Sequence, residues 1–169
     1  MAGGSLTPNG GNGHYIARPT AVGQDVTFSV TGVVNGSTQN MGSFTFKVRK
    51  LPDPTAYITY KDKDGNSVHF LGGRTFPKGT LLQTEGIGAA IDDGLLNIAF
   101  SVLSFETTFY DNMGNAIPEK SNGSKFSERQ KDMFRKLSAG KRFYITRVRA
   151  IGPDGIQRDL PQALEVIVR

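Results

Sequence analysis

The segment VRKLPDP, from Val48 to Pro54, limits how the first third of the 169-residue chain can fold. A run of alternating apolar and polar residues ends here at Pro52 and Pro54, which flank Asp53. Because proline lacks a backbone N–H and fixes φ, a strand does not continue through such a segment. A new pattern begins after it. We therefore expect residues 52-54 to be a joint between a unit of residues 1-51 and a unit of residues 55-169.

Strict alternation predicts two strands in the first unit, because one face of each strand would pack and the other would meet water. One inward set is Val26, Phe28 and Val30, and the other is Phe44, Phe46 and Val48. Asn35-Gly36 can supply the positive φ angles of a hairpin turn between them. A third strand is expected from His14 to Arg18. A β-sandwich typically needs about seven strands, so residues 1-51 are expected to be only part of a domain.

The second unit is expected to be rich in strands. Asp64-Gly65 predicts a hairpin between residues 57–61 and 66–71. A long strand is expected from Ile98 to Tyr110. Its apolar residues lie first at even and then at odd positions, which predicts a bulge or a change of sheet near Val102-Leu103. Further strands are expected at residues 142–151 and 163–168.

One α-helix is predicted near residues 128-138. Ser127 can cap it, and Gln130 can complete a capping box. Met133, Phe134 and Leu137 share one face at helical spacing. The fold class expected from the residues is therefore mainly β, with one α-helix in the second unit.

The sequence offers no recognisable catalytic chemistry. It contains no cysteine, so thiolate metal sites and disulfides are excluded. Neither His14 nor His69 lies in a nucleophile–base motif. Asp62-Lys63-Asp64-Gly65-Asn66 resembles the start of a calcium loop but lacks its later glycine and glutamate, so a hairpin is favoured. We expect no enzyme activity, no catalytic residues, no metal and no cofactor.

Positive charge is concentrated between residues 120 and 149, which hold ten of the twenty basic residues against only Glu128 and Asp132. Those two acids lie three or four residues from basic neighbours on the predicted helix, where such pairs form. No carboxylate close in sequence balances the cations that follow, which are Lys141, Arg142, Arg147 and Arg149. Arg147 and Arg149 are two apart and would share a strand face. We predict that these four residues form a docking face for an acidic partner.

The order of several motifs resembles a known family. They are GGNGHY, FTFKVRKLPDP, FLGGRTF, SVLSFETTFYD, KFSERQKDMFRKLSAGKRFYI and VRAIGPDGIQRDLP. Together they resemble the C-terminal periplasmic part of the GldM/PorM family of type IX secretion and gliding-motility proteins. The resemblance runs from about Asn9 to the end of the chain, and it is most specific from Phe126 to Pro161.

This resemblance implies a fold, a location and partners. Residues 1-51 would be the C-terminal portion of an immunoglobulin-like β-sandwich domain, and residues 55-169 the terminal domain. Family members are homodimers that are anchored in the inner membrane and extend through the periplasm. Their N-terminal part, which this chain would lack, works with GldL/PorL in a motor driven by the proton gradient. Their far end meets the outer-membrane-associated ring of GldK/PorK and GldN/PorN.

Two functions follow from these observations. The favoured one is a non-enzymatic module that transmits force and binds other proteins, without contacting the membrane itself. The alternative is a nucleic-acid-binding β domain that uses the basic strand 141-149. However, Phe143 and Tyr144 are the only aromatic side chains of that strand on which nucleic-acid bases could stack. We expect no nucleic-acid partner.

Overall fold

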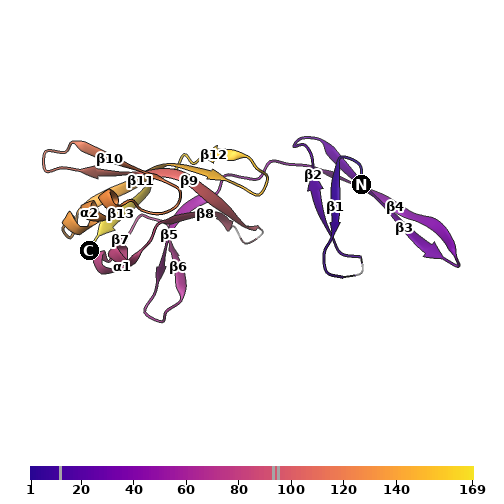
Figure 1. Ribbon diagram of the computed structural model, residues 1–169, viewed down its shortest axis with the longest axis horizontal. Helices are drawn as coiled ribbons and strands as arrows, with labels where there is room; N and C mark the ends of the chain where they lie inside the picture. Colours follow the sequence, from indigo (N-terminus) through magenta and orange to yellow (C-terminus); the bar gives the residue numbers. More distant parts are fainter. Residues whose placement is uncertain (12, 93, 95) are drawn as a thin grey trace. The chain divides into compact units, whose positions relative to one another are not determined.

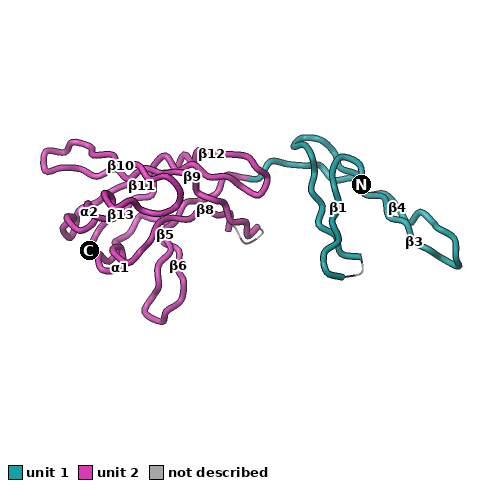
Figure 2. The backbone as a smooth tube through the Cα atoms, viewed as in Figure 1, with its two compact units in different colours: residues 1–51 teal, residues 52–169 magenta. Residues whose placement is uncertain are grey.

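The computed structural model describes residues 1–11, 13–92, 94 and 96–169. Asn12 of the GGNGHY motif lies outside these residues. The chain divides into two compact units, residues 1–51 and residues 52–169, which are coloured separately in Figure 2. Each unit is described by itself below.

The first unit consists of two antiparallel strand pairs among its described residues (Figure 1). β1 (Gly4–Pro8) pairs with β2 (Tyr15–Pro19), and β3 (Asp25–Val34) pairs with β4 (Ser37–Lys47). The sequence predicts three of these strands and misses β1, because its sequence GSLTP lacks apolar alternation. A bridge between Ala2 and Thr27 joins the start of the chain to β3.

The predicted hairpin turn between β3 and β4 is confirmed. Asn35 and Gly36 have φ angles of 50° and 77°, the positive values that a tight two-residue turn requires. The register sets Val26 opposite Phe46 and Phe28 opposite Phe44, so the two predicted apolar sets face the same way. The rings of Phe28 and Phe46 meet edge to face at 5.6 Å.

The second unit is built on one twisted sheet with the strand order β6-β5-β8-β9-β11-β13-β7, in which β10 also pairs with β9 and β12 with β11. All pairs are antiparallel except β13 with β7. The strands are β5 (Thr55–Lys61), β6 (Ser67–Phe70), β7 (Thr75–Phe76), β8 (Ile87–Asp92), β9 (Asn97–Tyr110), β10 (Ala116–Asn122), β11 (Arg142–Ile151), β12 (Gln157–Asp159) and β13 (Leu164–Val168).

β9 contains the predicted bulge. Phe100 and Val102 are buried, and beyond them the inward face passes to Phe105, Thr107 and Phe109. Val102 pairs with Ala150 and Ser104 with Arg149, so Leu103 is the extra residue on β9. The same strand pairs with β8 through residues 97–100 and with β10 through residues 104–110, so it also joins two parts of the sheet. The sequence prediction of a face change at this point is confirmed.

Helix α2 (Glu128–Lys136) begins as the sequence predicts. The Ser127 Oγ accepts a hydrogen bond from the Gln130 N–H, and the Gln130 Oε1 accepts one from the Ser127 N–H, which is a complete capping box. Phe134 then packs against three rings of the core, those of Phe109, Phe126 and Phe143, with centroids 4.9–5.7 Å away. α2 therefore covers the buried face of β9 and β11.

A second helix, α1 (Lys78–Gln83), is not predicted from the sequence. Its six residues contain a glycine and bury only Leu81, so they carry no helical apolar pattern. The Lys78 Nζ donates to the carbonyl oxygens of Arg135 and Leu137 at 2.8 and 2.7 Å, at the C-terminal end of α2. Carbonyls at a helix end lack partners within the helix, so α1 stabilises α2 from a distance in sequence.

The guanidinium of Arg158 is the most buried charged group of the second unit among the described residues, with a side chain 2% exposed. It donates to both carboxylate oxygens of Asp154, at 3.1 and 2.6 Å, and lies 5.2 Å above the ring of Phe100. Its Nε is 3.5 Å from the Asp53 carboxylate. Arg158 thus ties the GPDG turn to the residues that follow Leu51.

We expect Arg158→Met to destabilise the second unit by about 3 kcal/mol, because it leaves the Asp154 carboxylate without the cation that is built against it. Urea unfolding followed by circular dichroism measures the change. Arg149→Met is the matched control, since Arg149 also pairs bidentately with an aspartate but is 51% exposed, and we expect it to cost less than about 1 kcal/mol. Equal losses in the two variants would contradict this prediction.

Candidate partner-binding face

β11 carries three of the four cations predicted to bind a partner, and its backbone decides where they point. Phe143 and Ile145 are buried, as are Val148 and Ala150, so the inward positions change from odd to even along the strand. The change occurs at a bulge next to Arg147, which has a φ of 49°. Without this extra residue the alternation would direct Arg147 into the core. With it, the side chains of Arg147 and Arg149 are 80% and 51% exposed.

Each arginine of β11 faces a carboxylate from another strand. Arg147 lies 3.2 Å from Glu106 of β9, and Arg149 binds Asp159 of β12 with two hydrogen bonds of 2.7 and 3.3 Å. Sequence reasoning found no balancing acid because it considered only neighbours in sequence. Antiparallel pairing brings carboxylates that are distant in sequence to these arginines, so the arginines are paired in the folded chain.

The other end of β11 holds Arg142, and Lys141 precedes it. The Arg142 guanidinium and the Tyr144 hydroxyl both lie 3.0 Å from the same oxygen of Glu165 on β13. Tyr144 and Glu165 together raise the pKa of Arg142 above its usual value. Lys141 is exposed and makes no ion pair with any described residue. Arg142 and Arg147 are five residues apart, roughly 17 Å along a strand, so the four cations form two groups rather than one cluster.

A groove of about 620 Å³ lies where β11 bulges. Its charged lining comprises Glu106, Lys120, Arg147, Arg149 and Asp159, and the chain from Leu160 to Ala163 lines another part of it. The cations exceed the carboxylates by one, and Lys120 sits directly opposite Glu106 in the β9–β10 register. Arg149 lowers the pKa of the Asp159 carboxyl by hydrogen bonding, so that acid stays ionised at neutral pH.

We call this groove with Lys120, Arg147 and Arg149 the arginine groove. Its geometry suits a protein ligand with carboxylates. An arginine fork binds a carboxylate through two parallel hydrogen bonds, and ion pairs within the groove hold the guanidinium groups in place. Arg147 and Arg149 could be predicted from the sequence as site residues. Glu106, Lys120 and Asp159 could not, because only the strand register brings these three residues to the two arginines.

The residues predicted as a joint lie at the start of the second compact unit. Pro52 and Asp53 are exposed and Pro54 is buried. Asp53 reaches Arg158 as described above, a contact between residues too far apart in sequence to be predicted from it.

The residues considered above for catalysis or calcium binding make contacts that stabilise the fold. The ring of His69 stacks on Tyr57 at 3.8 Å. The Asp62 Oδ1 accepts hydrogen bonds from the backbone N–H groups of Asp64 and Asn66, as expected for a hairpin loop rather than a calcium site, and these bonds lower the pKa of Asp62. Within the described ranges, no group of three or more metal-ligating side chains occurs. No described helix has the length and apolar character needed to cross a bilayer.

Comparison with protein families gives two matches, which follow each other along the chain. The GldM third domain matches residues 1–49, and the GldM C-terminal domain matches residues 52–169. This chain belongs to the GldM family. A search of curated proteins found no match. The GldM family is a structural component of type IX secretion and gliding motility rather than a known enzyme family, and it is membrane-anchored with a periplasmic C-terminal part.

The positive φ of Arg147 can be tested by comparing glycine and valine at positions 147 and 149, where we expect opposite orders of stability. Arg147→Gly should give a free energy of unfolding about 1.5 kcal/mol higher than Arg147→Val, because glycine tolerates a φ of 49° and a β-branched residue does not. Chemical denaturation of both variants measures the difference.

Arg149 provides the matched position, since it is exposed on the same strand without a positive φ. There valine should be more stable than glycine, by up to about 1 kcal/mol, because β-branched residues favour extended backbone. The same order of stability at both positions would contradict the bulge.

Proposed function

We propose that this chain is a non-enzymatic periplasmic interaction and force-transmitting module of the type IX secretion and gliding motor. In this proposal it couples the inner-membrane motor, which includes GldL, to the outer-membrane-associated ring of GldK and GldN. The observation that carries the proposal is the pair of consecutive family matches, which together span residues 1–49 and 52–169.

The arginine groove, together with Lys141 and Arg142, is the docking face in this proposal. Exposed arginines at a surface groove are typical of protein interfaces, where they act as anchors. The carboxylates of Glu106 and Asp159 hold Arg147 and Arg149 in fixed positions before a partner arrives. Less side-chain freedom then needs to be lost on binding, and the partner need only supply competing acids.

The same geometry weighs against the nucleic-acid alternative. A phosphate backbone is bound by uninterrupted positive charge. Here Arg142, Arg147 and Arg149 each stand beside a carboxylate, which would repel phosphates. The protein partner is therefore the better-supported choice.

Neutralising the arginine groove tests the docking proposal. We expect Arg147→Gln with Arg149→Gln to weaken binding to a purified GldK–GldN complex about tenfold, because each exposed charged contact contributes about 0.5–1 kcal/mol. The affinity of the variant should also depend less on salt than that of the parent. Biolayer interferometry at low and high salt measures both effects.

A matched control removes two arginines elsewhere. Arg129 and Arg135 of α2 are 82% and 56% exposed and also pair with carboxylates. Arg129→Gln with Arg135→Gln should bind the ring like the parent. Equal weakening by both double variants would show only a net-charge effect, and duplex DNA bound more tightly by the parent than by the groove variant would favour the alternative function.

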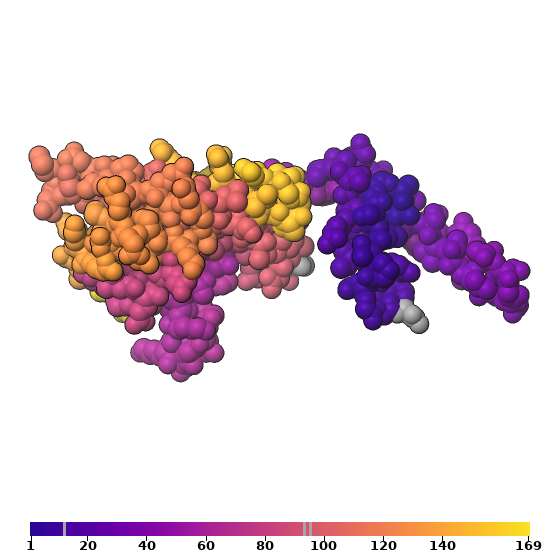
Figure 3. All heavy atoms as spheres, viewed as in Figure 1, coloured from indigo at the N-terminus to yellow at the C-terminus, as the bar shows by residue number. Residues whose placement is uncertain are grey.

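We further propose that the chain acts as a homodimer in which outside strands complete the first unit. Among its described residues, that unit buries one apolar side chain, Val26 at 3% exposure, and leaves Tyr15, Phe44 and Phe46 more than half exposed. An apolar groove of about 920 Å³ lies along Tyr15, Phe28, Val30 and Phe46. The outer part of the β3–β4 hairpin extends away from β1 and β2 (Figure 3), so its strand edges beyond the Ala2–Thr27 bridge are accessible.

Phe46→Lys tests this second proposal, because a charge in the apolar groove would oppose the packing of added strands. We expect the parent chain to dimerise in analytical ultracentrifugation and this variant to dissociate at least tenfold more readily. Val33→Lys is the control, since Val33 is 74% exposed and does not line the groove. A parent that stays monomeric at high concentration, with slowly exchanging amides throughout residues 25–49, would contradict the proposal.

A further inference from the structure

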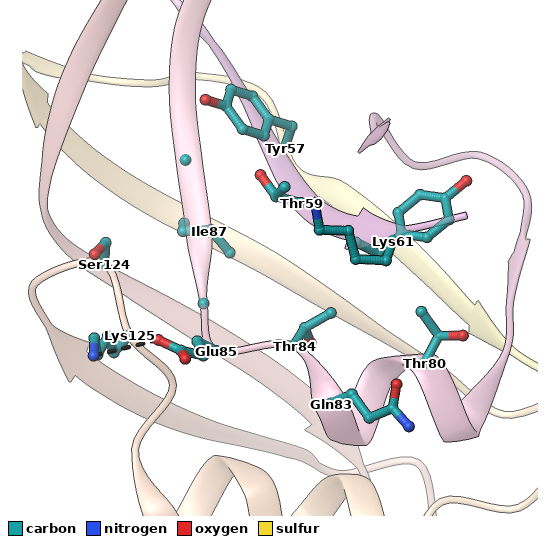
Figure 4. A pocket seen from close by; sticks show the side chains of 13 residues that line it. Tyr57, Thr59, Lys61, Thr80, Gln83, Thr84, Glu85, Ile87, Ser124 and Lys125 are labelled. Carbon is teal, nitrogen blue, oxygen red and sulfur yellow. Dashed lines mark ion pairs between the residues drawn. The ribbon is translucent and has the colours of Figure 1, made fainter. Parts of the chain in front are cut away.

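The strands β5 and β8 run side by side and then separate. β8 pairs with residues 55–58 of β5, but the residues just before β8 turn to another partner. The Ile87 N–H donates to the Ser124 carbonyl at 2.8 Å, and the Phe126 N–H donates to the Glu85 carbonyl at 2.8 Å. Figure 4 shows the resulting fork, with the end of β5 on one side and the start of β8 on the other.

Gly86 builds this fork into the sequence. A Cβ on Gly86 would lie 2.0 Å from the Ser124 carbonyl oxygen, so only glycine permits the close approach to residues 124–126. The bridge between Gly86 and Lys125 holds the residues just before β8 against residues 124–126, and the pairing of β5 with β8 ends at Ile58 and Ile87. The fork is therefore a fixed part of the fold.

The backbone of β5 beyond the fork is open on one edge. The Asp62 N–H donates to the Asn66 carbonyl, so Asp62 faces β6. Because successive residues of a strand direct their N–H and C=O groups to opposite edges, Thr59 and Lys61 direct theirs toward the fork. Within the described residues, these backbone groups of Thr59 and Lys61 make no hydrogen bond on that edge.

The open edge borders a groove of about 560 Å³. Tyr57, Thr59 and Lys61 of β5 line one side, and Gln83, Glu85 and Lys125 line the other (Figure 4). The β5–β6 hairpin stands out from the body of the second unit (Figure 3), and Thr59 and Lys61 are exposed, so another chain can reach this edge.

We propose that this fork binds an extended peptide segment of another protein by strand addition, with an acidic side chain opposite Lys61. Two backbone donors and two acceptors, spaced two residues apart on one edge, match the backbone of an added strand. Glu85 already pairs with Lys125 at 3.3 Å, so Lys61 is the cation of the groove left for the peptide. Its Nζ donates only to the Ser67 hydroxyl among the described residues, and opposite charges across a strand pair are favourable.

Amide exchange tests the open edge directly. In the free chain, the Thr59 and Lys61 N–H groups should exchange at least tenfold faster than the Tyr60 N–H, which faces β6. Two-dimensional NMR in deuterated buffer resolves the three. Equal protection of all three amides in a monomeric chain would overturn the proposal, since the edge would then be closed.

Binding is tested by disulfide tethering, which is clean because the chain has no cysteine. Gln83→Cys places a thiol on the groove, and Met113→Cys, at a site 88% exposed in the turn between β9 and β10, is the matched control. The probe is a five-residue threonine–valine peptide with a central aspartate and a terminal thiol, supplied as its mixed disulfide with 2-mercaptoethanol so that the protein thiol captures the peptide and releases 2-mercaptoethanol. We expect Gln83→Cys to retain it at about tenfold higher reductant than Met113→Cys does, as measured by mass spectrometry.

Three further probes separate strand addition from other binding. Two peptides carry N-methyl groups on alternate residues, so each blocks one edge. One of them should lose the tenfold advantage and the other should keep it. A peptide with lysine in place of the aspartate should also lose it. Equal retention of both methylated peptides would overturn strand addition, and equal retention of the lysine peptide would overturn the acidic preference.

Thr59→Pro removes the donor facing the fork without removing a hydrogen bond to β6. In the Gln83→Cys chain it should abolish preferential tethering. If that variant fails to fold, the methylated peptides still decide. A parent chain that dimerises with protected Thr59 and Lys61 amides would show that a second copy fills the edge, which would overturn the proposal of a different protein. None of these measurements involves the arginine groove.

Discussion

The second unit depends on two bulges that face each other across one strand pair. Leu103 is the extra residue on β9, and Arg147 is the extra residue on β11. Each bulge changes which residues of its strand face inward, so both strands change faces together. Phe100 and Val102 can then pack at one end of β9 while Phe105 and Phe109 pack against α2 at the other. A straight strand in either position would expose half of this core.

Both candidate interaction sites lie where a strand loses a neighbour. The arginine groove opens between the points at which β13 and β12 pair with β11, next to the bulge at Arg147. The fork opens where β8 leaves β5. Regular pairing buries backbone groups and side chains, whereas its interruptions leave grooves with polar groups at fixed positions. In this molecule the interruptions are set by Arg147 and Gly86.

Features with local causes could be predicted from the sequence. The capping box at Ser127, the turn at Asn35-Gly36 and the face change in β9 follow from residues close together in the chain, and the structure contains each of them. α1, β1 and β10 lack a clear periodic pattern, so tertiary contacts such as Lys78 with the end of α2 had to define them. The candidate site divides similarly. Arg147 and Arg149 stood out as unbalanced cations, but Glu106 and Asp159 reach them only through strand register.

If the chain transmits force as we propose, the contact between Asp53 and Arg158 shares the load. A pull that enters the second unit through Pro52 acts first on Asp53, one residue later, whose carboxylate is 3.5 Å from the Arg158 Nε. Arg158 is held in turn by Asp154 and lies over Phe100. The load is thus divided between the backbone of β5 and a side-chain connection to the β11–β12 turn. Two attachment points on different strands resist peeling of β5 better than one.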